Sequence, residues 1–144
     1  MELKPLLVAV DFSELSPKAI EYAVRLANNR GRKVDLLHVA LHSLPAHVEA
    51  HAPSEVLDKI RKSEQHTAVT NLEALMEAHV PLALRGEILL RRGPPADTIC
   101  QTAADAYEIV VVSTRGRTGL AHVLIGSVAE RVVRYSPTAV LVVR

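Results

Sequence analysis

The sequence predicts an α/β fold in which a doubly wound parallel sheet of five strands carries helices on both faces. Short apolar segments rich in β-branched residues alternate along the chain with segments of helical periodicity. Hydrophobic residues make up 49% of the 144 residues and aromatic residues only 3%, so Val, Leu, Ile and Ala must build the core, as is typical of a parallel sheet between helices. The length suits one core, and we expect a single domain over residues 1–144.

The first half of the chain begins with two predicted strands, Leu6 to Val10 and Val34 to Leu41, separated by a helix. The apolar positions of this helix are Ala19, Ile20, Ala23, Val24 and Ala27. Ser16 before Pro17 predicts an N-cap followed by a proline at the first helical position, and Gly31 follows the last apolar position. Each strand therefore has a clear boundary with this helix.

A longer helix connects the second strand to the third, which is predicted over Leu84 to Leu90. Its apolar positions include Leu57, Ile60, Leu72, Leu75 and Met76. The preceding segment, His42 to Pro53, has no clear period, and we interpret it as a loop that can contain a turn of helix.

The second half repeats the alternation. Gly93, Pro94 and Pro95 separate the third strand from a helix with apolar positions Ala96, Ile99, Cys100, Ala103 and Ala104. The fourth strand, Ile109 to Val112, precedes a helix with apolar positions Val128, Ala129, Val132 and Val133. Ser136-Pro137 ends that helix before the last strand, Ala139 to Val143. In such folds ligands bind beyond the carboxyl ends of the strands, so functional residues are expected there.

Composition disfavours several classes of function. The formal net charge is +1, from 17 basic and 16 acidic residues, which gives little electrostatic attraction to nucleic acid. No apolar stretch approaches the 18 residues of a membrane span. Cys100 is the single cysteine, and the apolar run Pro5 to Val10 is too short for a secretion signal. We therefore expect a cytoplasmic protein that binds neither nucleic acid nor membrane.

A glycine-rich stretch follows the fourth strand. Both common nucleotide signatures, the P-loop and Gly-x-Gly-x-x-Gly, are absent, but the chain reads Ser-Thr-Arg-Gly-Arg-Thr-Gly over Ser113 to Gly119, and Gly126-Ser127 opens the next helix. Glycine amides, hydroxyls and a helix N-terminus all favour anions, which indicates a polyphosphate cradle. The alternative is that Ser127 and Glu130 form a capping box and the glycines serve only the turn.

Four segments together resemble a known family. They are Val8 to Ser13, Leu37 to Val39, Gly93 to Ala96, and Ser113 to Glu130 followed by Pro137 to Val143. The sequence resembles the universal stress protein family, whose members are small α/β domains of the adenine-nucleotide α-hydrolase-like fold. The resemblance covers nearly the whole chain and implies the strand order 3-2-1-4-5, with the ends of the first and fourth strands side by side.

The ATP-binding branch of that family carries Gly-x2-Gly-x9-Gly-Ser/Thr. Gly116, nine residues and then Gly126-Ser127 match its later parts, whereas Ser113 stands at the first glycine. The resemblance implies that Asp11 and the backbone around Ala9 and Val39 hold adenine and ribose, that Gly116, Gly126, Ser127 and Val128 hold the phosphates, and that Val112, Ser113 and Arg115 line the same pocket. A Cβ at Ser113 would weaken this site if its φ were positive and would cost little in a β conformation.

Asp11 is placed at the nucleoside end on electrostatic grounds as well, because a carboxylate repels a triphosphate and accepts a hydrogen bond from a ribose hydroxyl. The alternative is that Asp11 only caps the following turn through Ser13 and Glu14.

Other chemistries fit less well. His47 and His51 have i, i+4 spacing with His42 nearby, but the segment lacks the ligand pattern of a zinc site. His38 reads as a packed histidine with a satisfied ring nitrogen, and His122 has no carboxylate beside it to make it a base. Cys100 lies on an apolar helix face and reads as an inert core thiol.

The predicted function is that of an ATP-binding stress protein without efficient catalysis, although slow hydrolysis remains compatible with the sequence. Magnesium or manganese would be held mainly by the phosphates, and nucleotide occupancy would set the loop Thr114 to Ile125 for a partner to read. The resemblance also implies a homodimer through the strand Thr138 to Val143. The alternative is a nucleotide-free dimeric interaction module of the same fold, distinguished by Ser113.

Overall fold

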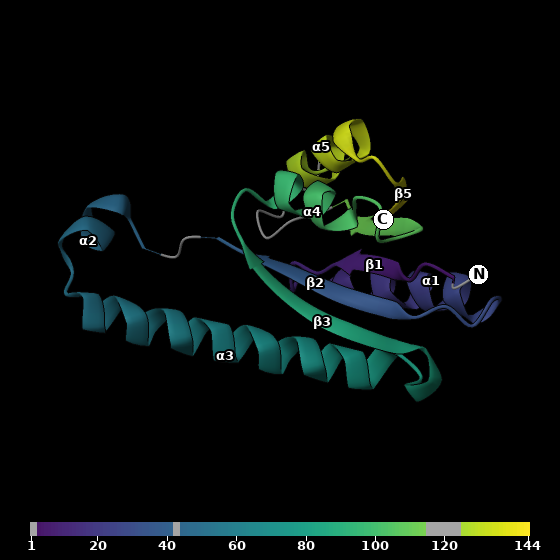
Figure 1. Ribbon diagram of the computed structural model, residues 1–144, viewed down its shortest axis with the longest axis horizontal. Helices are drawn as coiled ribbons and strands as arrows, with labels where there is room; N and C mark the ends of the chain where they lie inside the picture. The colour runs from purple at the N-terminus through teal and green to yellow at the C-terminus, as the bar shows by residue number, and fades with distance from the viewer. Residues whose placement is uncertain (1–2, 42–43, 115–124) are drawn as a thin grey trace.

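The computed structural model describes residues 3–41, 44–114 and 125–144 and contains a five-stranded parallel sheet in the order β3-β2-β1-β4-β5 (Figure 1). The strands are β1 (Leu6–Ala9), β2 (Val34–Ala40), β3 (Arg85–Arg92), β4 (Ile109–Ser113) and β5 (Ala139–Val143). This confirms the predicted fold class and strand order. β1 lies at the centre, where the order reverses between β2 and β4.

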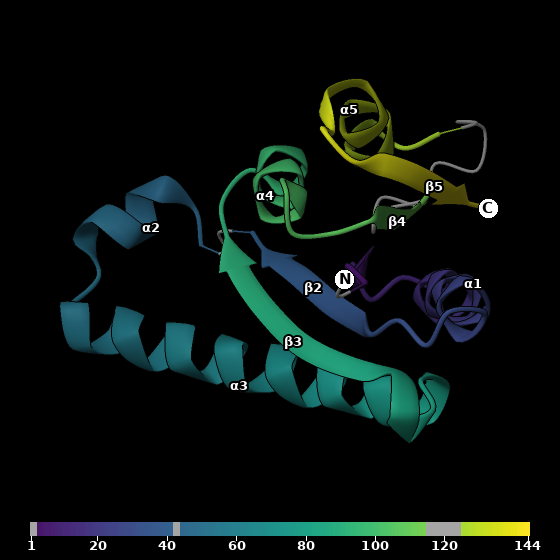
Figure 2. The same ribbon diagram turned by 45° about the vertical axis from the view of Figure 1, so that its right-hand side comes forward.

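Helices cover both faces of the sheet, as Figures 1 and 2 show. One face carries α1 (Ser16–Asn28) and α3 (Ser54–His79), and the other carries α4 (Pro95–Ala103) and α5 (Ser127–Tyr135). A short helix, α2 (Ala46–His51), confirms the helical turn expected between β2 and α3. Within the described ranges, none of the helices combines the length and apolar character that crossing a lipid bilayer requires.

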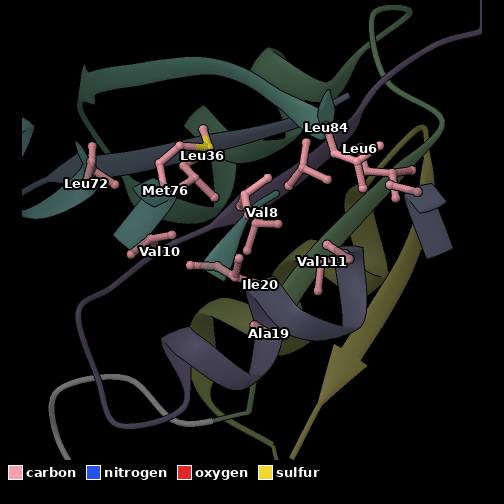
Figure 3. Packing of buried hydrophobic residues seen from close by; sticks show 14 of the residues in the cluster. Leu6, Val8, Val10, Ala19, Ile20, Leu36, Leu72, Met76, Leu84 and Val111 are labelled. Atoms are coloured by element: carbon pink, nitrogen blue, oxygen red, sulfur yellow. The ribbon is translucent and has the colours of Figure 1, made fainter. Parts of the chain in front are cut away.

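The strands feed two apolar clusters because their side chains alternate between the faces. Leu6 and Val8 of β1 pack with Ile20 and Met76 beneath α1 and α3 (Figure 3). Leu7 faces the other way and packs with residues of α4 and α5. The core is therefore aliphatic on both faces, as the composition predicts.

Several predicted boundaries are wrong by one or two residues. β1 and β2 each end one residue earlier, β4 includes Ser113, and Leu84 belongs to the 3-10 helix η1 (Leu82–Leu84), so that β3 begins at Arg85. Ser16 is not the N-cap of α1: Leu15 occupies that position, and the Ser16 hydroxyl donates to the Asp11 carboxylate instead (3.1 Å).

A buried polar network fixes the register of β2 and β3. The register shifts between Val34 and Leu36, and Asp35 lies there with 6% of its surface exposed. Its carboxylate accepts hydrogen bonds from the Glu87 amide (2.8 Å) and the Tyr107 hydroxyl (2.8 Å). A side chain at Gly86 would collide with Asp35 Oδ1, so only glycine allows this approach.

Candidate functional site

The carboxyl ends of β1 and β4 lie side by side at the point where the strand order reverses. Val8 of β1 pairs with Val111 of β4, Ser113 is the last residue of β4, and Asp11 follows β1 by two residues. In open α/β sheets this position is the usual ligand site. The topology therefore brings the predicted nucleoside and phosphate segments to one edge of the sheet.

Asp11 is held by the turn that follows β1. Its Oδ1 accepts hydrogen bonds from the Ser13 amide (2.9 Å) and the Ser16 hydroxyl (3.1 Å). The alternative role of Asp11 in the turn is thus partly confirmed, through Ser13. A carboxylate can accept about four hydrogen bonds, so this role in the turn is compatible with contact to a ligand.

The same turn contains a backbone feature that the sequence analysis missed. Phe12, the only phenylalanine in the chain, has a φ of 59°, a left-handed conformation that costs a bulky residue about 1–2 kcal/mol. Its ring contacts the His38 ring, with centroids 4.5 Å apart and planes at 42°. A single aromatic residue placed directly after a strand-end aspartate was the only signal available.

His38 is packed, as predicted. It is 8% exposed, and its Nδ1 lies 2.6 Å from the carbonyl oxygen of Val10. Since a carbonyl only accepts, Nδ1 carries the proton, and the ring joins the end of β2 to the end of β1. In the turn after β1, the buried Ser13 Oγ makes no hydrogen bond within the described part of the chain.

Three of the four apolar side chains predicted for the site, Ala9, Val39 and Val112, share one environment, whereas Val128 is 36% exposed near the start of α5. Val112 is buried in the cluster beneath α4 and α5, and Ala9, Val39 and Ile125 pack against that cluster. They come from β1, β2, β4 and the approach to α5. The structure brings them together as an apolar floor at the carboxyl edge of the sheet.

The start of α5 differs from the capping-box alternative. Gly126, not Ser127, is the N-cap, and its carbonyl accepts from the Glu130 amide (2.9 Å), with no hydrogen bond from a capping side chain. The capping-box interpretation of Ser127 is therefore wrong. Gly126 has φ −72° and ψ 158°, which any residue can adopt, so its backbone conformation does not require glycine.

Beside this helix start is a small hollow of about 90 Å³. The residues lining it are Pro94, Pro95, Ala96, Asp97, Ser127, Val128 and Arg131. Arg131 Nη2 lies 3.2 Å from Asp97 Oδ1. Sites that enclose a whole small ligand measure about 300–1,000 Å³, so this hollow is too small to enclose one. The predicted site residues Arg115 and Gly116 lie outside the described residues.

The remaining candidates are the metal-site histidines and the Cys100 thiol. Among the described residues, no three histidine, cysteine, aspartate or glutamate side chains are grouped to hold a metal ion. His47 and His51 lie exposed on α2, and His42 and His122 fall outside the described residues. Cys100 packs against the α4/α5 cluster, and burial raises the pKa of its thiol, which disfavours a reactive thiolate.

Comparison with known proteins gives a consistent result. The family profile described as the universal stress protein family matches residues 2–144. Universal stress protein YxiE of Bacillus subtilis is 30% identical over 144 residues, which cover 96% of this chain and 97% of YxiE.

Solved structures of similar proteins share the fold. The structure of MJ0577 superposes with a TM-score of 0.80 at 23% identity, over 99% of this chain and 96% of that one. A universal stress protein from Archaeoglobus fulgidus in complex with dAMP gives 0.63 at 21% identity, over 100% of both chains. A universal stress protein in complex with cAMP gives 0.65 at 20% identity, over 99% of this chain and 98% of that one.

Proposed function

Because the chain belongs to the universal stress protein family, we propose that it binds an adenine nucleotide at the carboxyl ends of β1 and β4, with ATP as the preferred ligand. Structural neighbours hold dAMP and cAMP on the same fold. The observation that carries the proposal is the start of α5, where Gly126 precedes a helix with no capping side chain. Its first amides can donate to phosphate, and a residue without Cβ lets the anion approach.

Ser113 is compatible with this proposal. It is the last residue of β4, and it is not among the non-glycine residues with positive φ in the described part of the chain, which are Phe12 and Asp105. The Cβ of Ser113 therefore adds no backbone strain of the kind that would make glycine necessary. We propose that the departure from the family motif leaves the phosphate site functional.

The nucleoside is proposed to lie over the apolar floor of Ala9, Val39 and Val112. Adenine offers a flat apolar face to such a surface, and Asp11 would accept a hydrogen bond from a ribose hydroxyl. The triphosphate then points towards Ser127 and Val128 and away from the carboxylate. The hollow beside α5 has the size for the terminal phosphates, and both Arg131 and its ion-pair partner Asp97 line it.

The nucleotide is proposed to act as a ligand and not as a fuel. Asp11 is already bonded within its turn, and the Nδ1 of His38 is engaged with a backbone carbonyl, so neither is placed as a ready general base. Magnesium or manganese would be held mainly through the phosphates. A slow hydrolysis of bound ATP is compatible with this arrangement.

We further propose that the protein is a homodimer paired through β5. The two edge strands differ: β5 reads Ala-Val-Leu-Val-Val, whereas β3 carries the exposed charges Glu87, Arg91 and Arg92. Charged residues protect an edge from pairing, and an apolar edge invites it. Val133 and Tyr135 on the neighbouring α5 are 50% and 62% exposed. These features support β5 as the interface.

A thermal titration with ATP and magnesium, with GTP as the control nucleotide, tests the binding proposal. A ligand at 100 times its dissociation constant stabilises by about 2.7 kcal/mol, which should raise the melting temperature by roughly 5–10 °C in a domain of this size. Gly126→Val, which adds a branched side chain where the phosphates are expected, should abolish the shift without unfolding the protein. A flat titration at millimolar ATP would instead favour the nucleotide-free interaction module.

The dimer is tested by light scattering. The expected mass is twice the 15.7 kDa of the chain, and Leu141→Lys in β5 should give the monomer. A monodisperse wild-type monomer at micromolar concentration would refute the dimer.

A further inference from the structure

The turn between β1 and α1 holds an aromatic residue in a conformation that L side chains disfavour. Phe12 has a φ of 59°. Asp105 is the other described non-glycine residue with positive φ, and aspartate tolerates it better because its short polar side chain can bond locally. A bulky residue persists in this region only where its surroundings hold it.

The surroundings of Phe12 come from β2. The His38 ring lies against the Phe12 ring with a centroid distance of 4.5 Å. His38 is itself immobilised by burial and by the 2.6 Å hydrogen bond from its Nδ1 to the Val10 carbonyl. Phe12 also packs against the cluster beneath α1 and α3. The ring is therefore fixed by contacts that lie outside its own turn.

The conformation of Phe12 determines where the chain goes next. The Ser13 amide and the Ser16 hydroxyl both return to Oδ1 of Asp11, at 2.9 and 3.1 Å. Both donors follow Phe12 in the sequence, so the backbone reversal at Phe12 sets their positions. If Phe12 relaxed to an ordinary negative φ, these donors would move away from Asp11.

We infer that Phe12 is a positioning residue: its ring, held against His38, keeps the turn in the left-handed conformation that aims the Asp11 carboxylate at the ribose. This inference rests on the proposed function, since it concerns the nucleoside end of that site. It assigns recognition of the sugar to a residue that acts through Asp11, whereas recognition of the phosphates depends on the start of α5.

The test compares ATP with its 2′-deoxy and 3′-deoxy analogues by isothermal titration calorimetry. Wild-type protein is expected to bind at least one deoxy analogue about tenfold more weakly than ATP, because a hydroxyl bonded to a carboxylate is lost. Asp11→Asn provides the reference for weakened recognition of that hydroxyl.

Two variants remove the ring in different ways. Phe12→Ala leaves a residue for which positive φ is strained, and Phe12→Gly adopts that φ freely but is not held in it. In both variants the affinities for ATP and for the deoxy analogue should differ by no more than about twofold, while the ratio of ATP to AMP affinity stays unchanged. Phe12→Tyr keeps the ring and should keep the discrimination. A merely structural role for Phe12 would alter the melting temperature without altering the deoxy ratio selectively.

The outcomes separate the inference from the proposed function. If Phe12→Ala or Phe12→Gly still discriminates about tenfold, or if wild-type protein binds ATP and both deoxy analogues equally, the inference is overturned. If wild-type protein binds no adenine nucleotide at all, the proposed function fails instead.

Discussion

Replacing Gly86 by alanine should be among the most destabilising single-methyl changes in this protein. A Cβ at position 86 collides with Oδ1 of Asp35 and would lie 3.0 Å from the carbonyl oxygen of Val34. The neighbouring backbone is part of the sheet and cannot move freely, so the carboxylate must give way. Asp35 would then lose its hydrogen bonds from the Glu87 amide and the Tyr107 hydroxyl.

The magnitude follows from those two bonds. A hydrogen bond to a charged group contributes about 1.5–3 kcal/mol, so Gly86→Ala should lower the free energy of unfolding by about 3–6 kcal/mol. For a domain of this size that corresponds to a fall in melting temperature on the order of 10 °C. Urea denaturation with a fluorescence or circular dichroism readout measures the first quantity, and calorimetry the second.

Gly31→Ala is the matched control. Gly31 has φ +64° but no atom within 4 Å of a Cβ placed on it, so this change adds strain without a collision and should cost about 1–2 kcal/mol. In an Asp35→Ala background the collision with Oδ1 disappears and only the 3.0 Å approach to the Val34 carbonyl oxygen remains, so Gly86→Ala should cost much less. A Gly86→Ala protein within 1 kcal/mol of wild type, or an undiminished cost in that background, would refute the argument.

Three further predictions concern the site and the core. Ser113→Gly should lower the unfolding free energy by about 0.5–1 kcal/mol and change the calorimetric Kd for ATP by less than about threefold; a tenfold gain would show that the serine obstructs the phosphates. Burial and the hydrogen bond to Asp35 raise the pKa of Tyr107, so wild-type stability should be complete below about pH 10 and lower by about 1.4 kcal/mol at pH 11. In Tyr107→Phe this loss of unfolding free energy between about pH 10 and pH 11 should disappear, as measured by urea titrations at the two pH values. A variant with the same pH dependence as wild type would contradict the prediction. Arg131→Gln should weaken the binding of ATP about five- to tenfold and that of AMP less than twofold. Arg134→Gln, at an exposed position of the same helix, is the control. Equal losses of affinity for both nucleotides would place Arg131 away from the terminal phosphates.

The fold was largely predictable because its elements are marked by local patterns. Apolar β-branched runs and helical spacing located all five strands and the four main helices, since each main helix buries one apolar face and the central strands are buried on both faces. The errors fall at element ends. Serine before proline is a local signal for a helix N-cap, and it predicts that role for Ser16. The hydrogen bond that Ser16 makes to Asp11 instead depends on how the turn after β1 folds back, which the local sequence does not specify.

The sequence predicts which residues stand at the carboxyl edge of the sheet but not their geometry. Asp11, Gly126 and Ser127 stand at strand and helix ends that the alternation alone places at one edge. The left-handed conformation of Phe12 could not be predicted from the single aromatic residue after Asp11, because the ring contact that accompanies it is with a residue 26 positions away. The collision that makes Gly86 necessary is equally invisible, since it depends on the register between two strands.

The polar residues at the amino and carboxyl ends of the sheet have different roles. At the amino end, buried Arg32 donates to the Lys4 carbonyl and pairs with Glu108, each at 3.2 Å, and Asp35 closes its network nearby. These contacts join separate elements and stabilise the fold without offering an open ligand site. At the carboxyl end the polar groups instead belong to the turn before α1 and to the start of α5. The turn before α1 contains Phe12 in its left-handed conformation. Substitutions at the amino end should therefore change stability and leave nucleotide affinity intact. Substitutions at the carboxyl end should change affinity at small cost in stability, because the contacts at the amino end secure the scaffold that positions the site residues.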